Sequence, residues 1–309
     1  MAMFADTVLM IRPDSFGYNH QTAASNSFQH SSKLSSDELR NAAIKESEKL
    51  RQTLVDNDIK VLYMHQQSGI NLPDAVFPNN WFTTHTDGTI ILYPMCSPSR
   101  REEYNSKIID YLSYNFDVGQ IIDLRDYAMK EQYLEGTGSL VFDTKNKIVF
   151  AADSIRTNPN LVEKISEHCS MQSCNIAFLD DAHQQIYHTN VCLSVGNGFI
   201  VVAEDNIADE AGKIKLNNLL AETETEVLKI TRNQLNNFCG NILQLQNSKK
   251  EPVLAMSTKA YQSFEPSQIK QLEKHTAIIH SGIPHIEATG GGSVRCMLAE
   301  IFLKPKYLN

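Results

Sequence analysis

Residues 80–93 read NWFTTHTDGTIILY, and this stretch predicts a β-hairpin. Two apolar or alternating runs flank an Asp-Gly turn at residues 87–88, which is a strong short-range hairpin signal. The same arrangement of two runs around a turn occurs three more times along the chain. These further pairs of runs are 139–142 with 148–152, 191–195 with 199–203, and 242–245 with 253–256. A hairpin that recurs in this way indicates a repeat architecture.

Helical segments are expected between the hairpins. The first follows a capping box, Ser35-x-x-Glu38, and its apolar residues recur at helical spacing. Three more helices are predicted over residues 101–115, 160–168 and 268–275, and strand-like runs are predicted at 61–64, 119–123, 175–179 and 277–279. The repeating unit is therefore a hairpin, a helix and one more strand.

The unit recurs at a nearly constant spacing. The residues that open the five hairpins are Asn80, Glu135, His188, Asn241 and Cys296, which are 55, 53, 53 and 55 residues apart. Such a period indicates a closed array of supersecondary units. The fifth hairpin has no second strand after Leu303, so we expect residues 7–11 to supply it and close the ring.

Composition limits the classes of function. The 309 residues include 28 basic and 36 acidic side chains, giving a net charge of −8, and 42% of them are hydrophobic. This acidic balance, without a basic run, disfavours nucleic acids and membranes as partners. Neither a secretory signal nor an apolar run of about 18 residues is evident. The six cysteines form no CxxC pair, so we expect a cytoplasmic protein with reduced thiols.

The repeat should bring the five hairpin-opening residues together near the axis of the ring. Cys296 and His188 form a nucleophile and base pair, and Glu135 is the third group that orients the imidazole and favours its cationic form. His188 and Asn190 are expected on one face of a strand. Glycines at 290–292 allow close approach of the backbone to a ligand. No metal or cofactor motif is present, so neither is expected.

Longer motifs resemble those of the guanidino-group-modifying enzymes, which comprise arginine deiminase, dimethylarginine dimethylaminohydrolase and the amidinotransferases. The matching segments are Pro73–Asn80, Ser99–Glu103, Leu134–Gly136, Ser154–Asn158, His188–Asn190 and Gly290–Cys296. The resemblance implies an α/β class fold, the five-bladed pseudo-symmetric α/β propeller (pentein fold), as a single domain over residues 1–309. It also implies a small-molecule substrate whose carboxylate pairs with Arg156, or with Arg101 as a second candidate. A homo-oligomer is left open.

Three amides stand where enzymes that act on a guanidinium commonly have carboxylates: Asn79, Asn80 and Asn190. A guanidinium has only donors and a positive charge, whereas a ureido group is neutral and has a carbonyl oxygen. An amide can donate to that oxygen and accept from the ureido NH₂. Asp74 remains as an acceptor for a ureido NH. The replacement of carboxylates by amides therefore favours citrulline over arginine as the substrate.

The N-terminal motif over residues 11–29 and the Phe77–Trp81 box are similar to the arginine-deiminase-related citrulline utilisation hydrolases (CtlX). This likeness implies hydrolysis of citrulline to ornithine and carbamate through an S-carbamoyl enzyme. The alternatives are a guanidine hydrolase, an amidinotransferase, and a non-enzymatic binding factor with the same fold, which would lack the Cys–His–Glu set. The polar segment Phe16–Ser35 is predicted to be a lid. Arg100 and Arg295 are expected to be solvated or structural.

Overall fold

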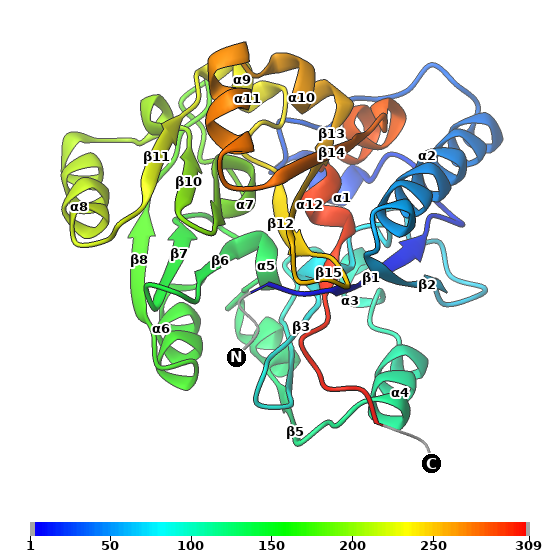
Figure 1. The fold of residues 1–309 in the computed structure, drawn as a ribbon. Coiled ribbons are helices and arrows are strands. Elements are labelled where there is room, and N and C mark those ends of the chain that lie inside the picture. Colours follow the sequence, from blue (N-terminus) through cyan, green and yellow to red (C-terminus); the bar gives the residue numbers. More distant parts are fainter. Residues whose placement is uncertain (1–3, 307–309) are drawn as a thin grey trace.

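The computed structural model describes residues 4–306 and contains five three-stranded sheets arranged around a common axis (Figure 1). In each sheet the first strand pairs antiparallel with the second, which pairs in parallel with the third. The predicted five-bladed α/β propeller is confirmed. In the order first, second and third, the strands are β3 (Phe82–Thr84), β4 (Thr89–Leu92) and β5 (Gln120–Asp123); β6 (Leu140–Asp143), β7 (Ile148–Ala152) and β8 (Gln172–Ile176); β9 (Leu193–Gly196), β10 (Phe199–Val202) and β11 (Glu226–Lys229); β12 (Leu243–Gln246), β13 (Pro252–Ser257) and β14 (Ala277–Ser281); and β15 (Ala299–Glu300), β1 (Thr7–Arg12) and β2 (Lys60–His65).

The helices divide into peripheral and axial groups. Longer helices lie at the periphery of the ring, where they cross from the second to the third strand of a sheet (Figure 1). They are α2 (Ser36–Asp56), α4 (Ser106–Asn115), α6 (Pro159–His168), α8 (Glu210–Ala221) and α11 (Pro266–Glu273), with α10 (Thr258–Ser263) preceding α11. Single-turn helices α5 (Gly136–Ser139), α7 (Thr189–Cys192) and α12 (Val294–Met297) lie nearer the axis and lead into a first strand, and the remaining helices are α1 (His20–Ala23), α3 (Pro98–Arg101) and α9 (Arg232–Asn236).

The ring closes where the sequence predicts. Strand β1 lies between β15 and β2, with Leu9 opposite Ala299 in the antiparallel pair and opposite Leu62 in the parallel pair. Leu9 is fully buried. The N-terminal strand therefore completes the fifth sheet and joins the two ends of the chain through backbone hydrogen bonds.

Three local predictions need correction. The helix expected from residue 101 begins at Ser106, because the side chain of Asn105 accepts a hydrogen bond from the backbone N–H of Lys107 and caps it. The strand expected at 175–179 lies at Gln172–Ile176. Helix α8 and strand β11 were not predicted, because Leu216 and Leu220 are the buried residues of α8 and give little apolar periodicity. None of the described helices is long and apolar enough to cross a membrane.

Ring closure through β1 yields a stability prediction. Leu9→Ala removes a fully buried side chain from the closing strand and leaves a cavity, so we expect a loss of about 2–5 kcal/mol in unfolding free energy. The matched change Leu34→Ala, at a side chain that is 40% exposed, should cost about 0.5 kcal/mol or less. Urea denaturation followed by circular dichroism measures both. Equal losses for the two variants would contradict the closing role of β1.

Candidate active site

The residues that open the five hairpins lie in or beside helical turns, not in strands. Glu135 precedes α5, His188 precedes α7, and Cys296 lies within α12. The expectation that His188 and Asn190 share a strand face is wrong, because β9 begins only at Leu193 and Asn190 belongs to the helical turn. Each turn nevertheless directs its polar side chain toward the axis, and these residues are buried.

The carboxylate of Glu135 is the centre of a buried cluster. Its Oε2 accepts a hydrogen bond from His188 Nε2 at 2.8 Å and lies 3.3 Å from Arg156 Nη1, while its Oε1 accepts from the backbone N–H of Cys96 at 2.9 Å. Burial opposes ionisation of this carboxyl. Arg156, His188 and Arg100 nevertheless hold the pKa of Glu135 well below its usual range. Glu135 is therefore an ionised group that fixes the imidazole ring.

His188 is neutral in the folded protein. Burial lowers its pKa to about 4 and outweighs the opposing effect of Glu135. Glu135 raises the pKa of the ring and so favours its cationic form, as the sequence predicts, but desolvation penalises the charged ring more than one carboxylate stabilises it. Since Nε2 donates to Glu135, Nδ1 is the basic nitrogen. A Cβ at Gly138 would lie 2.7 Å from Nδ1, so glycine is required for this close approach.

Cys296 lies between two amides. Asn241 Nδ2 donates to its Sγ at 3.2 Å and Asn190 Nδ2 donates at 3.6 Å. Burial raises the pKa of the Cys296 thiol, and hydrogen bonds from these two side chains oppose that rise. The resting side chain is therefore a thiol. Asn241 was not among the predicted site residues, although the period had already selected it as the residue that opens the fourth hairpin.

Of two adjacent arginines, Arg100 is the one that enters the cluster. Its Nε and Nη2 donate to the two oxygens of Glu103 at 2.8 Å, and its Nη1 donates to Asn80 Oδ1 at 2.7 Å. It also lies 4.0 Å from Asp74 Oδ2. Burial lowers the pKa of Arg100, but Glu103 and Asp74 raise it further, so the guanidinium stays charged.

Arg101, the second candidate for the substrate carboxylate, lies outside this cluster. Its guanidinium donates to the backbone carbonyls of Met95 and Cys96 at 3.0 Å and stacks over Tyr133. It therefore holds the segment whose Cys96 N–H binds Glu135. The other arginine expected to be solvated or structural, Arg295, is buried and pairs with Glu300 at 2.9 Å.

Three buried polar atoms in this region have no hydrogen-bond partner: Asn80 Nδ2, Asn79 Oδ1 and Asp74 Oδ1. The orientation of each amide follows from its neighbour. Arg100 has only donors, so Asn80 must turn its oxygen to Arg100 and leave its NH₂ group free. Thr137 Oγ1 donates to the backbone carbonyl of Asn79 and accepts from Asn79 Nδ2, which leaves Asn79 Oδ1 free. The site thus presents one amide donor and two acceptors.

The predicted lid covers this group. Asn19 Nδ2 and Thr22 Oγ1 donate to Asp74 Oδ2 at 2.8 and 3.1 Å, and Arg156 Nη2 donates to Ser25 Oγ at 2.6 Å. A second set of contacts holds the other end of the segment.

In this second set, Asn26 Nδ2 and Gln29 Nε2 donate to the carbonyl of Gly290. Gly291 has φ of +66°, and a Cβ there would lie 2.6 Å from Asn26. The glycines at 290–292 therefore allow the backbone to approach the lid closely.

The comparisons with known proteins agree with this geometry. A family model described as N,N dimethylarginine dimethylhydrolase, eukaryotic, matches residues 12–303. The chain belongs to this family. The described activity of the family is that of a hydrolase, and the resemblance of the chain to the guanidino-group-modifying enzymes is confirmed. A search of curated protein sequences finds no significant match.

Solved structures share the fold at low sequence identity. ArgZ, an arginine dihydrolase from the ornithine-ammonia cycle in cyanobacteria, has a TM-score of 0.73 and 16% identity over 98% of this chain and 41% of its own. Unliganded AgrE has a TM-score of 0.72 and 17% identity over 95% of this chain and 39% of its own. The chain thus spans less than half of these two proteins.

A third similar structure is a dimethylarginine dimethylaminohydrolase variant in adduct with S-methyl-L-thiocitrulline. Its TM-score is 0.63 at 12% identity, and the match covers 97% of this chain and all of that chain. Identities this low show the common fold. Among the described residues, no group of three or more His, Cys, Asp or Glu side chains is placed to hold a metal ion.

The Glu135–His188 contact predicts a change in pH dependence. Loss of kcat/KM at low pH should follow protonation of His188 near pH 4, because a cationic imidazole cannot accept a proton. Glu135→Gln removes the charge that raises the pKa of His188, so the acid limb should move to lower pH while kcat falls about 10²–10⁴-fold. Steady-state rates over a pH series measure both effects.

The exposed substitution Glu163→Gln is the matched control and should leave the profile unchanged. An acid limb that stays in place or moves to higher pH in Glu135→Gln would show that Glu135 does not set the titration of His188.

Proposed function

We propose that the chain hydrolyses the ureido group of citrulline to ornithine and carbamate. The observation that carries this proposal is the set of unpartnered buried atoms, with Asn80 Nδ2 as donor and Asn79 Oδ1 and Asp74 Oδ1 as acceptors. A ureido group offers a carbonyl acceptor and NH and NH₂ donors, which complement this set. A guanidinium offers donors only, so it would leave the Asn80 NH₂ group unpaired in a buried site.

The charges of the cluster also favour a neutral substrate. Each of its carboxylates already has an arginine within 4.0 Å: Glu103 and Asp74 have Arg100, and Glu135 has Arg156. A substrate guanidinium bound to Asn80 would lie beside the guanidinium of Arg100. Two like charges repel strongly in a desolvated site. A ureido group avoids this repulsion and accepts a hydrogen bond instead.

The first chemical step is attack by sulfur. Cys296 loses its proton as it attacks the ureido carbon, and the amides of Asn190 and Asn241 stabilise the developing thiolate because they already donate to Sγ. Asn80 Nδ2 donates to the carbonyl oxygen as negative charge builds on it. His188, which receives the proton at Nδ1, passes it to the departing ornithine nitrogen. The product of this step is an S-carbamoyl enzyme.

The second step is hydrolysis. His188 takes a proton from water, the resulting hydroxide attacks the carbamoyl carbon, and the sulfur leaves as carbamate forms and decays to ammonia and carbon dioxide. Arg156 pairs with the substrate carboxylate, since its guanidinium already lies under the lid beside Ser25. Arg101 is the less suitable candidate because it lies outside the cluster, where it donates to the backbone carbonyls of Met95 and Cys96.

A guanidine hydrolase that acts on arginine or a methylated arginine is the second candidate. The family match favours it, as do the acidic groups Asp74 and Glu103. An amidinotransferase would share the covalent step but pass the group to an amine. The single domain over residues 1–309, the cytoplasmic location, the use of no cofactor and the CtlX branch stay predictions from sequence, and the oligomeric state stays open.

Separate incubation with citrulline, arginine, agmatine and dimethylarginine tests the substrate. We expect ornithine and ammonia from citrulline, and Cys296→Ala should abolish turnover because no other nucleophile occupies its place. Cys174→Ala removes a buried thiol of β8 in the second sheet and should keep the activity. Citrulline formed from arginine would overturn the proposed substrate, and full activity of Cys296→Ala would overturn the mechanism.

Exchange of the Asn80 amide tests recognition of the ureido oxygen. Asn80→Asp replaces a free donor by an acceptor of the same size, so the ratio of kcat/KM for citrulline to that for arginine should fall by about 10²-fold or more. Asn105→Asp, at the cap of α4, is the matched control and should keep the ratio. A ratio unchanged in Asn80→Asp would show that Asn80 does not select the substrate.

A further inference from the structure

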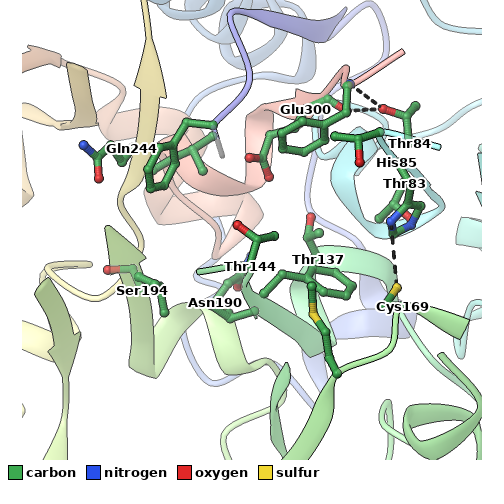
Figure 2. A pocket seen from close by; sticks show the side chains of 18 of the residues that line it. Thr83, Thr84, His85, Thr137, Thr144, Cys169, Asn190, Ser194, Gln244 and Glu300 are labelled. Atoms are coloured by element: carbon green, nitrogen blue, oxygen red, sulfur yellow. Dashed lines mark hydrogen bonds between the residues drawn. The ribbon is translucent and has the colours of Figure 1, made fainter. Parts of the chain in front are cut away.

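A cavity of about 520 Å³ runs along the axis of the ring (Figure 2). The first strand of every sheet contributes to its wall, through Thr84 of β3, Val141 of β6, Ser194 of β9, Gln244 of β12 and Glu300 of β15. We call this cavity the axial channel. Because each first strand follows a residue that opens a hairpin at the candidate active site, the channel starts directly behind that site.

One end of the axial channel reaches the catalytic groups. Asn190 and Thr137 line it, and Asn190 Nδ2 lies 3.6 Å from the sulfur of Cys296. Thr137 is followed by Gly138, against which the basic edge of His188 packs. A single layer of side chains therefore separates the channel from the nucleophile and the base.

The other end lies among the hairpin turns. Asp87 and Lys145 line it there, and both are exposed. On the opposite face of the site the lid is closed, and Cys296 and His188 are only 3% and 2% exposed. An amino-acid substrate must therefore displace the lid to enter, whereas the axial channel approaches the same atoms from behind.

The wall of the axial channel carries buried polar atoms that have no partner in the protein. They are Ser194 Oγ and Gln244 Nε2, in side chains that are 6% and 1% exposed. Buried groups of this kind are normally satisfied by ordered water. The polar wall thus suits small molecules that form hydrogen bonds.

We propose that the axial channel is the route by which water enters and the small product leaves while the lid stays closed over the site. This inference rests on the proposed function, since it concerns its second step. Water adds to the S-carbamoyl carbon, the C–S bond breaks as a C–O bond forms, and the proton passes from water through His188 to the sulfur. The carbamic acid so formed splits into ammonia and carbon dioxide, which are small enough for the axial channel.

A plug in the axial channel tests the proposal. Ser194→Phe fills the channel without breaking a hydrogen bond, because Ser194 Oγ has none. We expect kcat for citrulline to fall by about tenfold or more and KM to fall with it, so that kcat/KM changes little, because the plug slows the step after the covalent intermediate while substrate still enters on the lid side. The first-turnover burst of ornithine should persist, and intact-mass spectrometry should show the S-carbamoyl enzyme accumulating. Ser194→Leu, a smaller plug, should give an intermediate effect.

The control is Ser267→Phe on the exposed surface of α11, which should behave as the wild type. Thermal melts establish that each variant is folded, and Ser194→Leu carries the test if Ser194→Phe does not fold. Wild-type kcat in a folded plugged variant, or a slowed burst without the covalent adduct, would overturn the axial route.

The two proposals fail in different ways. If the wild-type protein releases no ornithine from citrulline but turns over arginine, the proposed substrate is wrong, and the same variants are then assayed with arginine. In that case a trapped amidino adduct in the plugged variants supports the route, and its absence together with wild-type turnover contradicts it.

Discussion

The buried carboxylate of Glu135 holds the centre of the molecule together. It binds His188 and Arg156 through one oxygen and the backbone of Cys96 through the other, and so joins the first, second and third blades. Arg156 extends the connection to Ser25 in the lid. Desolvating an ionised carboxylate is costly unless its oxygens are paired, and removal of one partner from such a cluster typically costs about 3–5 kcal/mol. Formation of the blades, orientation of the base and closure of the lid therefore depend on one another.

The same cluster determines what the site can recognise. Arg100 supplies the positive charge that Asp74 and Glu103 require, and it also fixes which way the Asn80 amide faces. Burial raises the pKa of Glu103 to about 7 even beside Arg100. Near neutral pH this part of the site therefore carries little negative charge beyond what Arg100 neutralises. A protein cation thus occupies the place where a guanidinium substrate would find its counter-charge. The proposed selectivity for a neutral ureido group then needs no large pocket, only one buried arginine and one oriented amide.

The sequence was sufficient for the ring, and it placed Glu135, His188 and Cys296 at corresponding positions because the period samples one position in each unit. That period also pointed to Asn241, although its side chain carries no catalytic signature. The sequence could not show which of Arg100 and Arg101 enters the buried cluster. Both residues fit the motif, and adjacent side chains on a helical turn point about 100° apart. The protonation state of His188 could not be predicted from the sequence for a related reason. Sequence motifs show which groups lie together. The pKa of a group depends on the balance between its burial and its pairing with other charges, and this balance follows from how deeply the group is buried in the structure.

The architecture also supports the proposal that the chain hydrolyses its substrate and does not transfer the group to an amine. A covalent carbamoyl enzyme is protected as long as the lid keeps bulk solvent and other amines away, yet its breakdown needs one water molecule. The ring has two faces, one covered by the lid and one that opens into the axial channel. The lid can therefore close over its face while the sulfur of Cys296 stays accessible to water from the other. Asn190 stands between Cys296 and the axial channel, so a molecule that reaches the carbon from behind must pass one amide side chain. On the proposed route, water passes this barrier and an amino acid of the size of ornithine does not, so the acceptor is selected by size.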